Sequence, residues 1–327
     1  MNKERNLNLW RAIKNGIYYR NNPYDWEKTI PRISESSLPH TNCIEGGLNT
    51  GQKLKQTNQS KHPLVSIITI VYNGDKHLEQ TIQSVLNQTY DNIEYIIIDG
   101  GSTDKSIDII RKYENKISYW ISEPDNGISD AFNKGIQICN GEIIGLINSD
   151  DWYKSTAVEL SVKSLNDRRN YDFSFGGLEL YKENVYSHSM CCDENYPNSI
   201  KYNIPAINHP TLFVKRSAYA RCGLFTTQLR YSMDYELFFR MYTKKIKGVC
   251  LKENIACMRI VGTSYKASTI PLLEVLQCSI MYGQSVPLSI ILYLIRVLKG
   301  KIRRLMESMG LERELHILRK TIERNYE

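Results

Sequence analysis

The fold of this chain is decided around the stretch Ile143-Ile144-Gly145-Leu146-Ile147-Asn148-Ser149-Asp150-Asp151, an apolar run that ends on two adjacent carboxylates. An apolar run this short, bounded by Gly141 and by acids, predicts a buried strand. Ligands of open α/β sheets bind outside the carboxyl ends of the strands. We therefore expect Asp150 and Asp151 to lie where a ligand binds.

Three earlier apolar runs repeat the pattern, and helical spacing of apolar residues separates the runs. We expect strands at 64–71, 93–98, 117–121 and 142–147, and helices near 78–86, 107–113 and 128–139. Alternation of strands and helices is typical of a parallel sheet with helices on both faces. The sequence therefore predicts an α/β fold.

Each predicted strand is followed by polar residues. These are Tyr72-Asn73-Gly74, the segment 99–104, the segment 123–127 and the segment 148–151. Four such ends on one edge of a sheet predict a ligand pocket. The first strand is followed neither by GxGxxG nor by GxxxxGK[ST], which argues against a dinucleotide-binding motif and a P-loop.

Adjacent carboxylates repel one another, so Asp150 and Asp151 need a cation or hydrogen-bond donors nearby. Mg²⁺ and Mn²⁺ bind oxygen ligands, usually one or two carboxylates plus substrate phosphates. The pair therefore predicts a divalent metal that holds phosphates. An equally good explanation is a loop or a helix N-terminus, where acids lie near a positive dipole. Asp99, at another strand end, could accept a hydrogen bond from a nucleobase N–H.

Composition is that of a globular protein, with 327 residues, 42% of them hydrophobic, and a net charge of +7. The eight cysteines show no CxxC pair and no zinc spacing, so we expect reduced thiols in a cytoplasmic protein. The N-terminus lacks the apolar core of a signal peptide. No run reaches the roughly 20 apolar residues that span a bilayer.

Composition also varies along the chain. Residues 1–62 are polar and predict an N-terminal extension with a linker. Residues 63–262 carry the strand and helix pattern, with a nucleotide-binding half at 63–152 and an acceptor half at 153–262. Residues 263–327 predict basic, amphipathic helices.

Five segments in order resemble one family. They are Val65-Ser66-Ile67-Ile68-Thr69-Ile70-Val71-Tyr72-Asn73, the segment 78–90, Ile98-Asp99-Gly100-Gly101-Ser102-Thr103-Asp104, Asp125-Asn126-Gly127-Ile128-Ser129-Asp130-Ala131-Phe132-Asn133-Lys134-Gly135, and Asn148-Ser149-Asp150-Asp151. Together they resemble the amino-terminal half of glycosyltransferase family 2, inverting enzymes of the GT-A fold. The similarity is especially to bacterial enzymes that build surface polysaccharides.

The resemblance implies a reaction and its site. A sugar would move from a nucleotide-diphosphate sugar, with a UDP-sugar favoured, to a hydroxyl of a glycan or lipid-linked acceptor. By resemblance, Asp99 contacts the nucleobase, and Ile70 and Tyr72 line the base pocket. Asp150 and Asp151 would hold ribose and the diphosphate with its Mn²⁺ or Mg²⁺.

The family's DxD pattern reads Asn148-Ser149-Asp150 here, so its first acid is absent. An inverting displacement also needs a carboxylate that deprotonates the acceptor hydroxyl. The resemblance places this general base at Asp234, with Glu236 as a second choice. Capping of the following helix is the alternative role for Asp234. His209 matches a segment between the two halves of the domain, where it could reach the diphosphate or acceptor, although a structural hydrogen bond also explains it.

The C-terminal region is basic and apolar at helical spacing. Its basic residues are Lys299, Lys301, Arg303, Arg304, Arg313, Arg319, Lys320 and Arg324. Such a helix can lie on the anionic inner face of a cell membrane, where lipid-linked acceptors are found. A helix packed on the catalytic domain or in a homodimer explains the pattern equally well. We expect no nucleic acid among the partners.

Three functions fit these observations. The first is a metal-dependent inverting glycosyltransferase, and the absence of a QxxRW motif argues against a processive synthase. The second is a sugar-phosphate nucleotidyltransferase, which would be expected to open with a glycine-rich phosphate loop. The third is a non-catalytic scaffold with the same fold, against which four acids converging on one pocket argue: Asp99, Asp150, Asp151 and Asp234.

Overall fold

The computed structural model describes residues 7–33, 43–50, 62–167, 170–202, 207–260 and 269–311. The chain forms two compact units, one of Met1–Asn22 with Lys266–Glu327 and the other of Pro23–Tyr265. This division differs from the predicted one, which put residues 1–62 together in a single extension. Most of the predicted linker before His62, and the basic residues from Arg313 onward, lie outside the described residues.

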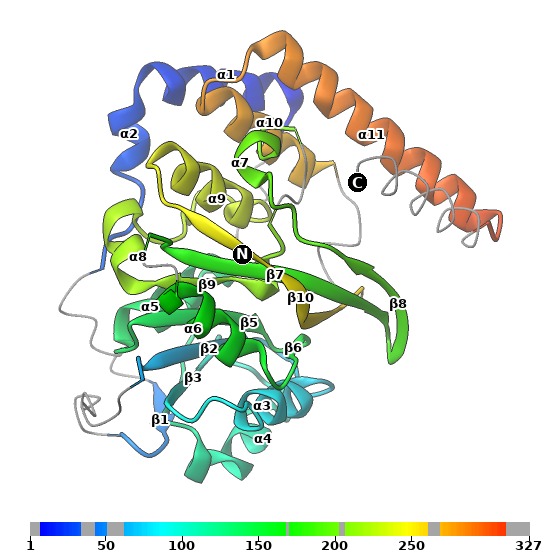
Figure 1. Ribbon diagram of the computed structural model, residues 1–327. Helices are drawn as coiled ribbons and strands as arrows, with labels where there is room; N and C mark the ends of the chain where they lie inside the picture. Colours follow the sequence, from blue (N-terminus) through cyan, green and yellow to red (C-terminus); the bar gives the residue numbers. More distant parts are fainter. Residues whose placement is uncertain are drawn as a thin grey trace. The chain divides into compact units, whose positions relative to one another are not determined.

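The larger unit contains all the strands of the described structure (Figure 1). They are β1 (Ile44–Gly46), β2 (Val65–Val71), β3 (Ile93–Asp99), β4 (Tyr119–Ser122), β5 (Ile143–Asn148), β6 (Trp152–Tyr153), β7 (Phe173–Lys182), β8 (Val185–Met190), β9 (Phe213–Lys215) and β10 (Gly248–Arg259). The helices are α2 (Pro23–Glu27), α3 (Leu78–Leu86), α4 (Ser106–Lys112), α5 (Ile128–Ile138), α6 (Ala157–Asp167), α7 (Tyr196–Ser199), α8 (Arg216–Cys222) and α9 (Met233–Thr243), with 3₁₀ turns at Glu114–Lys116 and His209–Thr211.

The strands form one ten-stranded sheet within the described residues. Its order is β1-β4-β3-β2-β5-β9-β7-β10-β6, with β8 paired to β7. Strands β4, β3, β2 and β5 are parallel, and so are β7 and β10. Strand β9 runs antiparallel between β5 and β7, and β1 and β6 are antiparallel edges. The predicted α/β fold with a parallel set of central strands is confirmed.

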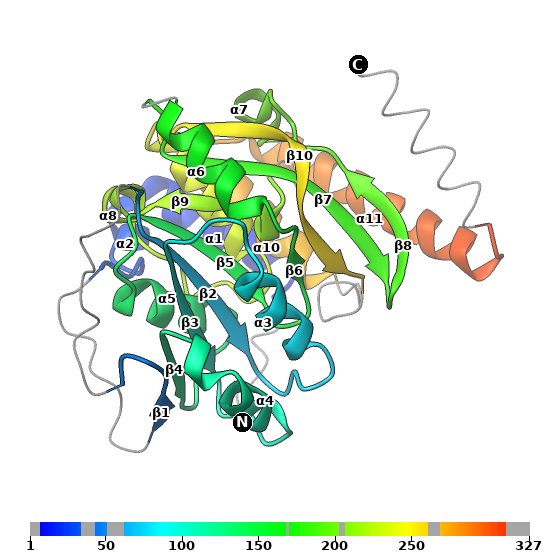
Figure 2. The ribbon, with the colours of Figure 1, turned by 60° about the horizontal axis from the view of Figure 1, so that its bottom comes forward.

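Helices cover both faces of the parallel strands. Side chains alternate between the two faces of a strand, so these buried strands present apolar residues on each face for a helix to cover. On one face, Ile67 and Ile97 belong to a buried apolar cluster that includes residues of α3, α4 and α6 (Figure 2). On the other face α5 packs closely on β2. A Cβ at Gly135 would lie 2.4 Å from Cγ2 of Ile68, so a side chain at this position would push α5 away from the sheet.

The register of the parallel strands brings their carboxyl ends together. Val71 of β2 pairs with Asp99 of β3, and Asp99 pairs with Ser122 of β4. On the other side of β2, Ile70 pairs with Asn148 of β5. The polar segments that follow these strands therefore lie at one edge of the sheet, as the sequence predicts.

A segment near the N-terminus packs on the second half of this unit. Trp26 and Ile30 are buried, and the Leu224 N–H donates to the Pro31 carbonyl at 2.9 Å. The ammonium of Lys244, the residue that follows α9, pairs with Glu27 at 2.9 Å. Residues 23–33 thus brace the segment after α8 and the end of α9, the helix that carries Asp234 and Glu236.

The smaller unit consists of α1 (Leu9–Asn21), α10 (Ile270–Met281) and α11 (Val286–Ser308). Its core holds Ala12 and Ile13 of α1 with Leu273, Leu276 and Ile280 of α10. Within the described ranges, no helix has the length and apolar character needed to cross a membrane.

One prediction about the cysteines is wrong. Cys192 and Cys250 are joined by a disulfide, so the expectation of eight reduced thiols fails for this pair. The two are 58 positions apart in the sequence, and they meet because β8, which Cys192 follows, and β10, which contains Cys250, both pair with β7. The six other cysteines are thiols.

Candidate active site

The turn after β5 holds one of its two acids inside the protein. Asp151 is only 1% exposed, and its Oδ2 accepts a hydrogen bond from the Asn148 amide at 3.2 Å. Its Oδ1 accepts from the backbone N–H of Arg259 at 3.3 Å. The Thr81 hydroxyl of α3 is within hydrogen-bond distance of the carbonyls of Ser149, at 2.9 Å, and of Asp151, at 2.7 Å. The backbone of this turn is therefore held from both sides.

Asp150, the neighbouring acid, is partly exposed. Its carboxylate accepts no hydrogen bond from any other described residue. Burial raises the pKa of Asp150, although the Arg259 guanidinium opposes the shift. Burial and the charge of Asp150 raise the pKa of Asp151 well above its usual value. Two such carboxylates do not ionise together easily, so a cation at the exposed Asp150 would stabilise the charged pair.

The donor set around this turn fits one class of metal. In the described part of the chain, three or more His, Cys, Asp or Glu side chains nowhere gather into a metal cage. Mg²⁺ and Mn²⁺ do not need such a cage, because one or two carboxylates, substrate phosphates and water complete their shell. The unbonded carboxylate of Asp150 fits this mode of binding, whereas the buried carboxylate of Asp151 is already hydrogen-bonded.

Arg259, at the end of β10, is a site residue that the sequence analysis missed. It is 4% exposed, and its guanidinium donates to the Asp150 carbonyl and to the Gln80 side chain of α3. The guanidinium also lies over the Trp152 ring, 4.5 Å from the centroid. Arg259 is 108 residues away from Asp151, so no spacing along the chain points to it. The arginine holds the acid turn against α3 and β6.

Asp99 ends β3 and is fully buried. Its Oδ2 accepts hydrogen bonds from the N–H groups of Gly101 and Ser102, at 3.0 and 2.9 Å, and from the Ser122 hydroxyl at 2.6 Å. Its Oδ1 is buried and has no hydrogen-bond partner among the described residues. A buried carboxylate oxygen left without a donor is costly. A donor from a ligand would satisfy it.

The two other predicted nucleotide contacts differ in position. The Ile70 side chain is buried in the sheet, and its backbone pairs with β3 and β5. Tyr72 lies just beyond the strand end and is 66% exposed, so its ring is open to a ligand. Asn73 follows with φ 51°, and its side-chain oxygen accepts from the Thr103 N–H at 2.8 Å. This bond joins the loops after β2 and β3.

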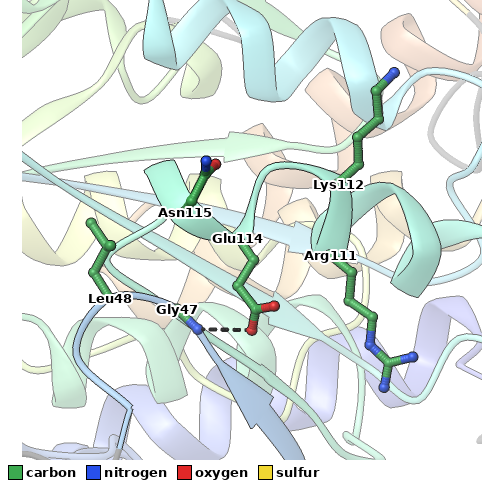
Figure 3. Close-up of a pocket in the computed structure, with 6 residues that line it drawn as sticks. All are labelled: Gly47, Leu48, Arg111, Lys112, Glu114 and Asn115. Atoms are coloured by element: carbon green, nitrogen blue, oxygen red, sulfur yellow. Dashed lines mark hydrogen bonds between the residues drawn. The ribbon is translucent and has the colours of Figure 1, made fainter.

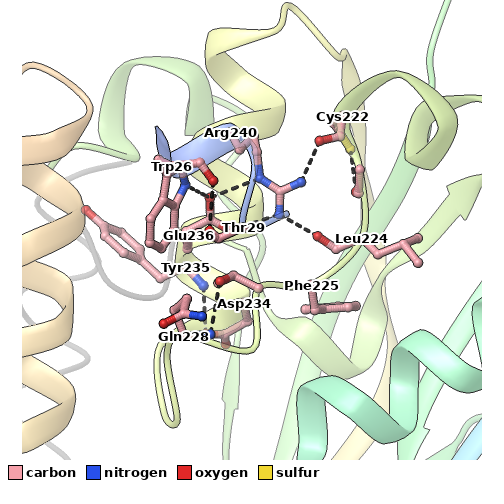
Figure 4. Close-up of polar contacts among 12 residues, drawn as sticks. Trp26, Thr29, Cys222, Leu224, Phe225, Gln228, Asp234, Tyr235, Glu236 and Arg240 are labelled. Carbon is pink, nitrogen blue, oxygen red and sulfur yellow. Dashed lines mark hydrogen bonds and ion pairs between the residues drawn. The ribbon is translucent and has the colours of Figure 1, made fainter. Parts of the chain in front are cut away.

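Asp234 lies in the first turn of α9, after the N-cap residue Ser232 (Figure 4). Its Oδ1 accepts the Tyr235 N–H at 2.7 Å. The side chain is partly buried, and burial raises the pKa of the carboxyl. A carboxylate whose pKa is raised is a stronger base than an exposed one. The helix-start role and the base role are therefore compatible at Asp234.

Glu236, the second choice for the base, is held by structural contacts. It is fully buried, and Arg240 donates to both of its carboxylate oxygens at 2.9 Å (Figure 4). The Trp26 indole N–H donates to the same carboxylate at 3.2 Å. The guanidinium of Arg240 also donates to the carbonyls of Cys222 and Leu224. These contacts give the Glu236 carboxylate a structural role, and they favour Asp234 over Glu236 as the proposed base.

His209 begins a 3₁₀ turn and packs among aromatic rings. The centroid of its ring lies 5.4 Å from that of Phe132 and 5.9 Å from that of Phe225. Burial lowers the pKa of His209 to about 4, so the imidazole is neutral at pH 7. It carries no positive charge with which to bind a diphosphate. The buried Nε2 has no hydrogen-bond partner among the described residues, so a hydrogen bond to a ligand is the contact left to it.

A hollow elsewhere on this unit contains none of these residues (Figure 3). Its volume is about 380 Å³, and its walls are Gly47, Leu48, Arg111, Lys112, Glu114 and Asn115. Glu114 accepts the Gly47 N–H at 3.2 Å and so joins the loop after β1 to the turn after α4. The hollow lacks the converging acids of the strand ends, and we assign it no role in the site.

Known proteins resemble this chain in sequence and in fold. Residues 66–223 match the family described as Glycosyl transferase family 2. An uncharacterised glycosyltransferase of Rickettsia typhi is 35% identical over 57% of this chain and 60% of its own length. The chain thus spans about 60% of the length of the first curated relatives that it matches.

Two solved structures share the fold at low sequence identity. S. aureus TarS in complex with UDP-GlcNAc has a TM-score of 0.54 and 15% identity over 70% of each chain. The mannosyltransferase PcManGT of Pyrobaculum calidifontis, in complex with GDP-Man and Mn²⁺, has a TM-score of 0.50 and 14% identity over 93% of this chain and 89% of its own. The fold is therefore GT-A, and residues 66–223 match a glycosyl transferase family 2 domain.

Proposed function

We propose that this protein is an inverting glycosyltransferase that moves a sugar from a nucleotide-diphosphate sugar to a hydroxyl of a glycan or lipid-linked acceptor. One observation carries the proposal. At the strand-end edge of a family 2 domain, Asp99 Oδ1 has no hydrogen-bond partner among the described residues, and the Asp150 carboxylate accepts no hydrogen bond from any other described residue. The first suits a nucleobase and the second suits a diphosphate with its metal.

The donor nucleotide would be held by the ends of β2 and β3. The free Oδ1 of Asp99 would accept an N–H of the base, and the exposed ring of Tyr72 would lie beside it. The backbone of Ile70, not its buried side chain, would form the floor of the base pocket. TarS binds UDP-GlcNAc, which supports a UDP-sugar as the first donor to test.

The diphosphate would lie at the turn after β5. Asp150 would hold a divalent ion, and such an ion would neutralise the charge of the departing diphosphate. Asp151 and Arg259 would not bind it directly but would keep the Asp150 backbone in place, through the hydrogen bonds described above. The Mn²⁺ in the PcManGT complex supports Mn²⁺ as the ion to test first.

Asp234 would act as the general base. As the acceptor oxygen attacks the anomeric carbon, its proton would pass to the Asp234 carboxylate. A bond forms between that oxygen and the anomeric carbon while the bond from this carbon to the diphosphate oxygen breaks. Because the two bonds lie on opposite faces of the sugar ring, the configuration inverts. The raised pKa of Asp234 supports its choice as the base.

A nucleotidyltransferase is disfavoured by the loop after β2. Such an enzyme needs free backbone N–H groups there to bind phosphate. Here the N–H of Asn73 donates to the Ser102 hydroxyl at 2.8 Å, and that of Gly74 to Ser106 at 3.0 Å. The Asp75 N–H donates to the Asp104 carboxylate at 3.0 Å. Three successive N–H groups are thus already used.

A homodimer and a cytoplasmic location stay predictions.

The first test is the melting temperature of the purified chain with UDP, GDP, dTDP or CMP, each with and without Mn²⁺. A ligand that binds only the folded state raises the melting temperature. We expect a rise with one diphosphate, UDP first, that requires Mn²⁺ and is lost in Asp99→Asn. The matched control is Asp108→Asn, an exposed acid on α4, which should keep the rise.

The product then decides between transferase and scaffold. A nucleotide sugar chosen from the melting data should be consumed, and NMR of the new glycosidic bond should show the inverted anomeric configuration. If no nucleotide raises the melting temperature, the scaffold interpretation holds and the proposed transfer is wrong.

A further inference from the structure

Helix α11 of the smaller unit has two apolar sides. Val286, Ile290 and Tyr293 pack on the core that α1 and α10 share. A second set of apolar side chains is exposed, at 43% to 63% of their area: Ile291, Leu294, Ile295, Leu298, Ile302, Leu305 and, just beyond the helix, Met309. The packed side already explains why α11 folds onto α10. Among the described residues of this unit, the apolar core does not include the second side.

The exposed residues form one continuous stripe. Their steps along the chain are three or four residues, apart from the neighbouring pair Leu294 and Ile295, and at about 100° per residue they fall within roughly 100° of the helix circumference. Val286, Ile290 and Tyr293 fall outside this stripe, on another side of the same wheel. Monomeric proteins rarely expose an apolar surface of this extent without a partner for it.

Positive charge borders the stripe. On the wheel, Lys299 follows one edge and Lys301 the other, and both are exposed. Arg296, Arg303 and Arg304 add three more basic residues, and Glu307 is the single acid in the sequence of α11. Lysine stems can lie along an apolar surface while their ammonium groups reach an anionic layer above it.

We infer that this face of α11 binds an anionic lipid surface, with the helix lying in the plane of the membrane interface. A lipid layer offers fluid apolar chains to the stripe and negative headgroups to both of its edges. A second copy of the chain fits less well. Two identical stripes packed together would place lysines against lysines along the seam, which costs free energy unless opposite charges intervene. The inference stands on α11 alone and does not rest on the proposed function.

Flotation of the full chain with lipid vesicles tests the inference. We expect binding to vesicles of phosphatidylcholine mixed with phosphatidylglycerol, and much weaker binding to phosphatidylcholine alone. Lys299→Gln with Lys301→Gln should weaken binding to the mixed vesicles about 30-fold, at roughly 1 kcal/mol for each lysine near an anionic surface. Leu294→Glu with Leu298→Glu should weaken it by more than about tenfold, because the stripe is broken.

The matched control is Val185→Glu, an equally drastic change at a residue of β8 that is 71% exposed. It should bind vesicles like the unchanged chain. All variants change exposed side chains, and their melting temperatures check that they fold. The native mass, measured by light scattering, should not change in Leu294→Glu with Leu298→Glu.

Three results would overturn the inference. One is the absence of binding to either vesicle, which would point to an acidic protein as the partner. Another is equal binding to both vesicle types and no effect of the lysine changes. The third is a dimer that becomes a monomer when the stripe is broken, which would make this face a contact between two copies.

Discussion

Two acid pairs in this protein resemble each other in sequence and differ in what neutralises them. At the start of α9, Glu236 is buried and forms an ion pair with Arg240, while Asp234 keeps a raised pKa. After β5, Asp151 is buried but is met only by an N–H and an amide, and the pKa of both acids is raised.

The difference shows where a cation is needed. The α9 pair has its counter-ion inside the fold, so one acid is free for proton transfer without a metal. Among the described residues, the acids after β5 form no ion pair with a guanidinium, because that of Arg259 donates to the Asp150 carbonyl and to Gln80. A bound cation would neutralise the acids after β5, whereas it would add little stability to the pair at the start of α9.

The largest expected effect comes from the free acid of the α9 pair. Asp234→Asn should lower the rate of transfer about 100- to 10,000-fold, the usual contribution of a general base, with nucleotide affinity unchanged. Turnover and calorimetric titration with the nucleotide measure the two quantities. Glu159→Gln, which changes the first-turn acid of α6, is the control and should keep full turnover. Full turnover in Asp234→Asn would remove Asp234 as the base.

The next effect is on stability, at the paired acid. Arg240→Met leaves the Glu236 carboxylate buried without its counter-ion, which should cost about 3–5 kcal/mol of the free energy of unfolding. Urea denaturation measures it. Replacing both partners, Arg240→Met with Glu236→Leu, should recover most of the loss because no charge is then stranded. If Arg240→Met alone were as stable as the unchanged chain, the ion pair would not hold the start of α9.

The third prediction separates the two acids after β5. Asp150→Asn should remove most of the gain in nucleotide affinity that Mn²⁺ provides, and Asp151→Asn should reduce this gain less, because its carboxylate faces Arg259 and Asn148. A change in a residue that only orients a metal ligand costs about 10- to 100-fold in metal affinity. Titrations with and without Mn²⁺ measure both variants. A larger loss in Asp151→Asn would reverse the two roles.

The smallest expected effect is a shift in pH dependence. The base must be ionised to accept a proton, and burial raises the pKa of Asp234 above the ordinary 3.8. As pH falls, kcat/KM should therefore decline at a higher pH than an exposed aspartate would give. The profile of Asp150→Asn should keep this acid limb, because the limb belongs to Asp234. If the acid limb disappeared in Asp150→Asn, the limb would belong to the metal site instead.

Local patterns were enough to predict the fold. The four parallel strands and the helices between them come from apolar spacing within short windows, and the strand ends with Asp99 and Asp150 follow from that order. Parallel register then places these ends side by side without further information. This part of the site could be predicted because its residues belong to neighbouring strands of one simple motif.

The rest depends on contacts between distant segments. Glu236 lies only two residues from Asp234 in the sequence, and its burial beside Arg240 and Trp26 is visible only in the fold, where it favours Asp234 as the proposed base. Arg259 and Cys250 of the disulfide both belong to β10. No local pattern predicts that this strand pairs with β7. The N-terminal residues that join α10 and α11 in one unit belong to the same class of long-range contact.

The long reach of Arg259 bears on how such enzymes can be recombined. Its guanidinium comes from β10, in the predicted acceptor half, yet it contacts the Asp150 carbonyl and Gln80 in the predicted nucleotide half. A chimaera that joins this nucleotide half to a foreign acceptor half would keep Asp150 and Asp151 in its sequence but lose the arginine that shapes their turn. An exchange of acceptor specificity should therefore succeed only when the strand end around Arg259 is taken from the same parent protein as the nucleotide half.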